Sequence, residues 1–231
     1  MEKRIPLILI LVVIMFSLPA QTQTQNQIRF KLWYSMDSTL ALPDQDFDSQ
    51  PEISGYKYSI KAIHQIVPFI LEGYLYGWKF DYTPSDKTRN VTEFFDFSSV
   101  QSVVITDSHI AYDSPLITDT GTVFSCWITY SLLKYQIDLQ QYRNSINFPK
   151  ISGIGRAPIQ DDTDGIIKAF TNAAKNAIRD YYSSIIKNKP KEITGTVYLT
   201  SEPRYYVDAG KYVATLDFYL EKDTIQLYHY Y

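Results

Sequence analysis

The sequence is poor in the residues on which common stabilising and catalytic sites depend. Its 231 residues include one cysteine, Cys126, and three histidines. A single cysteine excludes an intramolecular disulfide, and its position in the apolar segment 123–128 predicts a buried thiol rather than a reactive one. The chain also has no Gly-x-Ser-x-Gly segment and no His-Glu-x-x-His segment. The usual anchors of serine hydrolases and zinc proteases are therefore absent.

Clustered positive charge is also absent. The chain has 22 Lys and Arg against 25 Asp and Glu, a formal net charge of −3. Phosphate contacts need a clustered basic face, so we expect no binding of nucleic acid. Gly153 and Gly155 precede a predicted helix, but Pro158 occupies the third glycine position of a dinucleotide-binding loop. The sequence predicts no nucleotide or other cofactor.

The N-terminus has the pattern of a secretory signal peptide. A positively charged start at residues 1–4 is followed by a nearly unbroken apolar stretch, residues 7–18, and by the small residue Ala20. The apolar stretch is shorter than the roughly 20 residues that span a bilayer. We therefore expect residues 1–20 to be cleaved as a signal peptide, leaving a polar linker, residues 21–27, and no membrane span. This predicts a periplasmic or extracellular protein.

Residues 28–231 are expected to form a single α+β domain, with a largely antiparallel twisted sheet and two helices packed on one face of it. The clearer helix is predicted over residues 164–187, where apolar residues form one stripe and Asp162 or Thr163 can cap the start. A second helix is predicted over residues 58–71, although Pro68 lies within its pattern.

Alternating apolar residues predict the strands of this domain. The expected strands are residues 28–34, 89–97, 103–112, 122–133, 193–200, 205–207, 211–220 and 224–230. The strand at 122–133 is expected to continue toward Ile137, and a turn at 221–223 to separate the last two strands. Residues 144–160 contain two glycines and two prolines, which predict a long loop.

Aromatic residues are concentrated in one further segment of a chain that has 20 tyrosines. Every second residue of this segment is aromatic: Tyr74, Tyr76, Trp78, Phe80 and Tyr82. A period of two places these rings on one side of a strand. Because tyrosine suits both the boundary of a core and a binding surface, this face is either a packing surface or a candidate binding site.

A histidine between two aspartates forms a second candidate. Asp107, His109 and Asp113 share strand parity, and such a group can bind a metal or act in acid–base catalysis. The alternative is an ordinary polar strand surface. Strand neighbours two residues apart are separated by about 7 Å, so they converge only through a ligand.

Three alternating aspartates resemble the start of a calcium-binding loop. They are Asp44, Asp46 and Asp48. Ser49 stands where the loop needs glycine, and Gly55 stands where it needs a bidentate glutamate. A solvated acidic loop is the simpler interpretation, and no metal is expected.

Three functions remain open from the sequence. The first is a non-catalytic envelope protein that binds a partner protein or associates with copies of itself. The second is a binder of a small apolar or saccharide ligand, because aromatic faces line such pockets. The third is an enzyme, of hydrolase type, that uses the group around His109.

Overall fold

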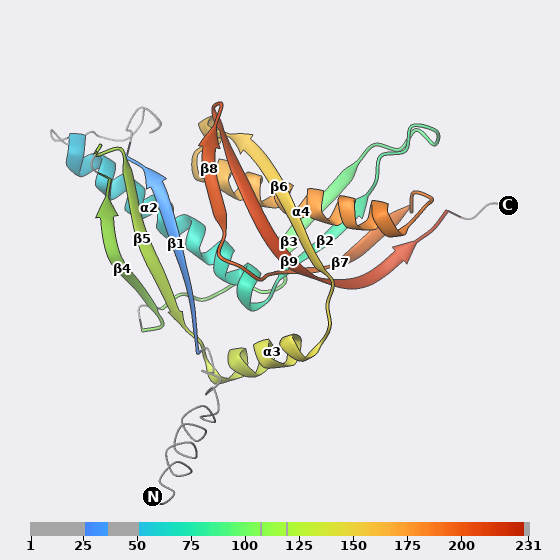
Figure 1. Cartoon of the computed structure of the whole chain (residues 1–231), viewed down its shortest axis with the longest axis horizontal. Helices are drawn as coiled ribbons and strands as arrows, with labels where there is room; N and C mark the ends of the chain where they lie inside the picture. The colour runs from blue at the N-terminus through green and yellow to red at the C-terminus, as the bar shows by residue number, and fades with distance from the viewer. Residues whose placement is uncertain (1–25, 37–50, 107, 119, 229–231) are drawn as a thin grey trace, which may run out of the picture.

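The computed structural model describes residues 26–36, 51–106, 108–118 and 120–228, and for residues 51–55 only the backbone. Its elements in chain order are β1 (Gln27–Ser35), α2 (Pro51–Leu75), β2 (Trp78–Thr83), β3 (Phe94–Ser99), β4 (Ile110–Ile117), β5 (Val123–Ser131), α3 (Lys134–Ser145), β6 (Lys150–Pro158), η2 (Ile159–Asp161), α4 (Asp162–Ile185), β7 (Glu192–Leu199), β8 (Arg204–Asp208) and β9 (Lys211–Gln226) (Figure 1). The predicted signal peptide and the three aspartates Asp44, Asp46 and Asp48 lie outside the described residues.

The strands form two antiparallel sheets. The small sheet has the strand order β1-β5-β4, and the large sheet has the order β3-β2-β7-β9-β6, with β8 also paired to β9. Every pairing between these strands is antiparallel. The mixed α+β class and the antiparallel pairing predicted from the sequence are therefore confirmed. The placement of two helices on one face of one sheet stays a prediction.

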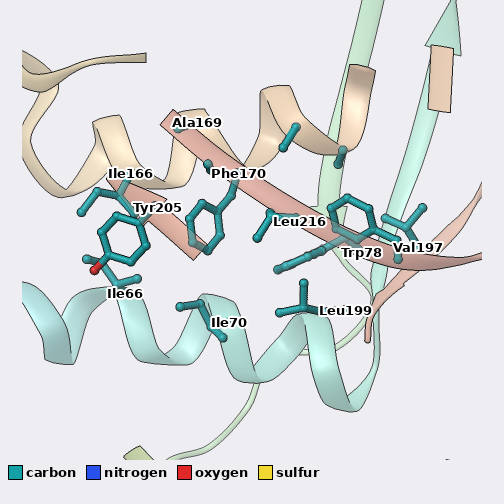
Figure 2. Close-up of a cluster of buried hydrophobic side chains, with 14 of the residues drawn as sticks. Ile66, Ile70, Trp78, Ile166, Ala169, Phe170, Val197, Leu199, Tyr205 and Leu216 are labelled. Atoms are coloured by element: carbon teal, nitrogen blue, oxygen red, sulfur yellow. The ribbon is translucent and has the colours of Figure 1, made fainter. Parts of the chain in front are cut away.

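Apart from Val213, the buried apolar residues of both sheets belong to one cluster. Strand β1 contributes one face to this cluster: its even-numbered residues, such as Phe30 and Leu32, are buried, while Arg29 and Lys31 on the other face are exposed. In the centre of the cluster, Ile70 of α2 lies opposite Phe170 of α4 (Figure 2). Both helices thus contribute to the same core.

Helix α4 packs directly on β6 because small residues line both surfaces. Ala169, Ala173 and Ala177 are buried on α4. Gly153 and Gly155 are the buried residues opposite them on β6, where an added Cβ would lie about as close as 2 Å to the backbone of α4. The expected loop over residues 144–160 was wrong, since its glycines permit close helix–strand contact rather than a turn.

Helix α2 is longer than predicted and includes part of the aromatic segment. It begins at Pro51 and continues through Pro68 to Leu75. The backbone N–H groups of Tyr76 and Gly77 both donate to the carbonyl of Glu72 at 2.8 Å, and Gly77 has a φ of +81°. This is a left-handed glycine termination of a helix, so the strand begins only at Trp78.

The C-terminal strands also differ from the prediction at one point. The expected turn at residues 221–223 was wrong, because β9 continues without a break from Lys211 to Gln226. Its first part pairs with β8 and its last part with β7. Polar residues 221–223 resemble a turn in the sequence because that part of β9 is exposed.

Asp162 joins the start of α4 to the other half of the molecule. Its carboxylate accepts hydrogen bonds from the hydroxyl groups of Tyr34 on β1 and Tyr58 on α2. Burial raises the pKa of this carboxyl group. The N-cap position is Asp161 and makes no side-chain capping bond, so the capping role expected for Asp162 was wrong and its side chain links three elements instead.

Candidate binding region around helix α3

Helix α3 is oriented with its polar residues inward. In Figure 1 it lies between the end of β5 and the start of β6. The buried side chains of this helix are Gln136 and Arg143, which are 2% and 8% exposed. Three of its large apolar residues, Tyr135, Leu139 and Tyr142, are instead exposed, and Ile137 is half-buried. The expected continuation of the strand toward Ile137 was wrong, because α3 begins only two residues after β5. The polar inward face of α3 gives no buried apolar pattern from which a helix could be predicted.

Arg143 holds α3 against the C-terminus of α2. One guanidinium nitrogen, Nη1, donates to the carbonyl of Tyr74 at 3.3 Å, and Nη2 donates to the carbonyl of Leu75. The guanidinium also lies 4.6 Å from the ring centre of Tyr198. A cation at the negative end of a helix is favourable, so this buried charge has a structural role.

Gln136 connects α3 to tyrosine hydroxyl groups. Its Nε2 donates to the hydroxyl oxygens of Tyr76 at 3.2 Å and Tyr130 at 3.3 Å. Its Oε1 accepts from the backbone N–H of Leu133 at 2.9 Å. These bonds satisfy the buried amide, as such a group requires.

One flank of the helix, beside the buried face, carries an exposed apolar row, which we call the outward stripe. It consists of Tyr135, Leu139, Tyr142 and Ile146. Their exposed fractions are 54%, 36%, 65% and 36%, respectively. Spacings of four and three residues place Tyr135, Leu139 and Tyr142 on one helical face, and Ile146 follows the helix directly as its C-cap residue, with an extended backbone. This spacing is visible in the sequence and is the signal that could have predicted the helix.

A cavity of about 300 Å³ lies on the inward side of α3. Four parts of the fold line it. They are β1 with Gln27, Ile28 and Arg29; α3 with Gln140, Arg143 and Asn144; α2 with Tyr74; and the large sheet and the ends of its strands with Tyr198, Leu199, Thr200, Glu202 and Tyr219. This volume is at the lower end of the range of ligand pockets. Polar and aromatic groups thus converge where α3 meets both sheets.

The five aromatic residues predicted as a possible surface are divided by the fold. Trp78, Phe80 and Tyr82 lie on β2 and are 1%, 1% and 2% exposed. Tyr74 is half-buried, lines the cavity, and donates from its hydroxyl group to the carbonyl of Ser201 at 2.7 Å. Tyr76 shares a hydroxyl–hydroxyl contact of 3.0 Å with Tyr135. Only these two tyrosines reach the region around α3.

The polar group around His109 is only partly described. Asp107 lies outside the described residues. His109 precedes β4, with its ring 6.5 Å from that of Tyr130, and Asp113 accepts from the hydroxyl group of Thr129 at 3.1 Å. Among the described residues, no three His, Cys, Asp or Glu side chains are grouped to hold a metal ion.

Cys126 faces the core from β5. It is 3% exposed, and burial raises the pKa of its thiol to about 11. A thiol that stays protonated at neutral pH is a poor nucleophile. The packing role that the sequence predicts for Cys126 agrees with this position.

Comparison with known proteins adds a family but no activity. A family model matches residues 15–228. A protein of Treponema pallidum (strain Nichols), named "Uncharacterized protein", is 32% identical over 162 residues, which are 68% of this chain and 65% of that protein. The chain therefore spans less than two thirds of that relative. No solved structure matches, and none of the described helices is long and apolar enough to cross a membrane.

Proposed function

The chain belongs to a family of uncharacterised proteins, the family whose model matches residues 15–228, and we propose that it is an exported, non-catalytic protein that binds a partner protein through the outward stripe of α3. One observation carries this proposal. The helix exposes its row of apolar side chains and buries an arginine and a glutamine. A contiguous exposed apolar surface marks an interaction site more often than an isolated exposed residue does.

The partner is a protein that presents an apolar helical face. The spacing of the stripe is that of a helix–helix seam, in which side chains three and four residues apart meet a second helix. Lys134 and Asp138 are the exposed charged residues of the helix, and they cancel in formal charge. An uncharged seam favours an apolar surface over a charged one.

A second copy of this chain is a less suitable occupant. Helix α3 has 12 residues and is therefore about 18 Å long. Stable interfaces bury about 800 Å² on each partner, more than two such helices supply to each other. A larger partner that also contacts the neighbouring surface meets this requirement.

Export is the second component of the proposal. It is supported by the charged start, apolar middle and small residue of residues 1–20. Intact mass of the protein purified from its native source tests it. We expect a chain that begins near residue 21, whereas a full-length chain with its N-terminal methionine segment retained would contradict it.

Site-specific photo-crosslinking in the native cell envelope tests the binding role. A photoreactive residue at position 142 should form one dominant crosslinked species. The matched control is position 141, where Gln141 is also exposed but lies off the stripe. Equal crosslinking from both positions would refute the proposal, and a species with twice the mass of this chain would identify a second copy as the occupant.

A further inference from the structure

The free edge of β1 points toward the large sheet. The backbone N–H of Lys31 donates to Glu202 Oε1 at 2.9 Å, and that of Trp33 donates to the hydroxyl oxygen of Tyr205 at 3.2 Å. These two N–H groups therefore point away from β5. Alternate residues of an antiparallel strand point to the same side, so the N–H and C=O groups of Arg29 and Gln27 also point away from β5.

Most of this edge is occupied by side chains. The carbonyl of Trp33 accepts from Tyr205, and that of Ser35 accepts from the hydroxyl group of Ser59 at 3.0 Å. In the part of the chain that the structure describes, we find no such partner on the open edge for the N–H and C=O groups of Arg29. The cavity under α3 lies at this point and is lined by Gln27, Ile28 and Arg29.

The charge of the cavity favours an acidic ligand. Among the lining residues, Arg29 and Arg143 face one carboxylate, that of Glu202, which already accepts from the backbone of Lys31. A second carboxylate, that of Glu221, acts on Arg143 from outside the lining. Within the described ranges, neither arginine is found in an ion pair. A carboxylate entering the cavity would compensate this excess of positive charge.

We propose that an extended peptide segment of a partner protein, carrying an acidic side chain, adds to the open edge of β1 in this cavity. Its main chain pairs with the N–H and C=O groups of Arg29 and Gln27, as in other additions of a strand to a sheet edge. Its acidic side chain approaches Arg143, and its neighbouring side chains contact the rings of Tyr198 and Tyr219. This site is separate from the outward stripe and does not depend on it.

The experiment is an NMR titration of the natively processed, ¹⁵N-labelled protein with a defined peptide. The probe is the blocked pentapeptide acetyl-Thr-Val-Glu-Val-Thr-amide, with a Gln version of the same peptide as the charge control. We expect saturable shifts of the amide signals of Arg29 and Gln27 with a dissociation constant of about 1 mM. The Gln peptide should bind severalfold more weakly.

Two variants of Arg29 separate the backbone from the side chain. Arg29→Pro removes the N–H group, which edge strands tolerate, and should lower the affinity at least about tenfold. Arg29→Ala keeps the N–H group and should bind the Gln peptide as the unchanged protein does. If Arg29→Pro fails to fold in a thermal unfolding control, Gln27→Pro at the first residue of β1 replaces it.

Three results would overturn the proposal. One is the absence of saturable shifts at Arg29 and Gln27 with either peptide at about 5 mM. A second is equal binding by the Arg29→Pro and Arg29→Ala variants. The third is a response of these amides to N-acetylglucosamine but not to peptide, which would make the cavity a saccharide site. None of these results affects crosslinking from the outward stripe, so the two proposals fail independently.

Discussion

Helices α3 and α4 differ in where their apolar side chains lie. In α4 the apolar residues, among them Ile166 and Phe170, are buried against β6 and the core. In α3 the apolar residues Leu139 and Tyr142 are exposed, and polar residues hold the helix in place. The buried stripe of α4 stabilises the fold. The exposed stripe of α3 does not, because polar contacts hold that helix in place, so its apolar residues indicate a role in binding.

The sharpest way to test the α4 side of this comparison is Gly155→Ala. The added Cβ would lie 2.0 Å from the carbonyl oxygen of Ala169 and 2.2 Å from the amide nitrogen of Ala173. Because both atoms belong to the backbone, relief requires the helix to move, and we expect unfolding in urea to become easier by about 3 kcal/mol. The control is Arg156→Ala on the exposed face of β6, and similar losses in both variants would contradict tight packing.

The polar anchoring of α3 is tested by Arg143→Met. The change keeps much of the side-chain length but leaves the carbonyls of Tyr74 and Leu75 without this donor. Hydrogen bonds to charged groups contribute about 2 kcal/mol, so we expect the free energy of unfolding to fall by about that amount. If the loss were below about 0.5 kcal/mol, the inward face of α3 would not anchor the helix.

Elements whose buried residues form a regular local pattern could be predicted from the sequence, and the others could not. The helix over residues 164–187 was predicted within two residues of α4 (Asp162–Ile185) at each end because its stripe is buried and its pattern is regular. Strand β6 was not predicted, because Gly153 and Gly155 are required by the close approach of α4, a helix that follows later in the chain. Such a contact is tertiary, and no local pattern contains it.

The candidate site was less predictable than the fold. Tyr74 was singled out, but as a strand residue, because the aromatic period of two crosses the end of α2 without a break. Arg143 carries no local signal, since its partners are carbonyl groups at the end of another helix. The open edge of β1 depends on side chains from Glu202 and Tyr205, some 170 residues away.

The substitution Asp162→Asn, at the start of α4, tests how the stability of the protein depends on pH. Burial raises the pKa of Asp162 above its ordinary value of 3.8, so the folded state binds this proton more tightly than the unfolded state. Its contribution to stability is fully present below the unfolded pKa and is lost as pH rises through the folded pKa. Asn keeps one oxygen that accepts from Tyr34 or Tyr58, its NH₂ group donates to the other hydroxyl oxygen, and it tolerates the φ of +56°.

We therefore expect the wild-type protein to lose stability relative to Asp162→Asn as pH rises through the raised pKa of Asp162. Urea unfolding of both proteins at a series of pH values measures this difference. Parallel curves for the two proteins would show that the carboxyl group of Asp162 does not titrate differently in the folded state.

The smallest stability effect is expected on the outward stripe. Leu139→Ser removes an exposed apolar side chain, and surface substitutions of this kind change the free energy of unfolding by about 0.5 kcal/mol or less. The corresponding change in α4, Phe170→Ser, should cost at least about 3 kcal/mol, because the ring is 1% exposed. Similar losses from both changes would mean that the stripe belongs to the core.

The most direct measurement combines this variant with crosslinking. The yield of the crosslinked species from position 142 is compared in the native envelope between the unchanged chain and Leu139→Ser. We predict that the yield falls by about fivefold while the unfolding free energy stays within about 0.5 kcal/mol. An unchanged yield would contradict the claim that the exposed apolar face of α3 is a binding surface.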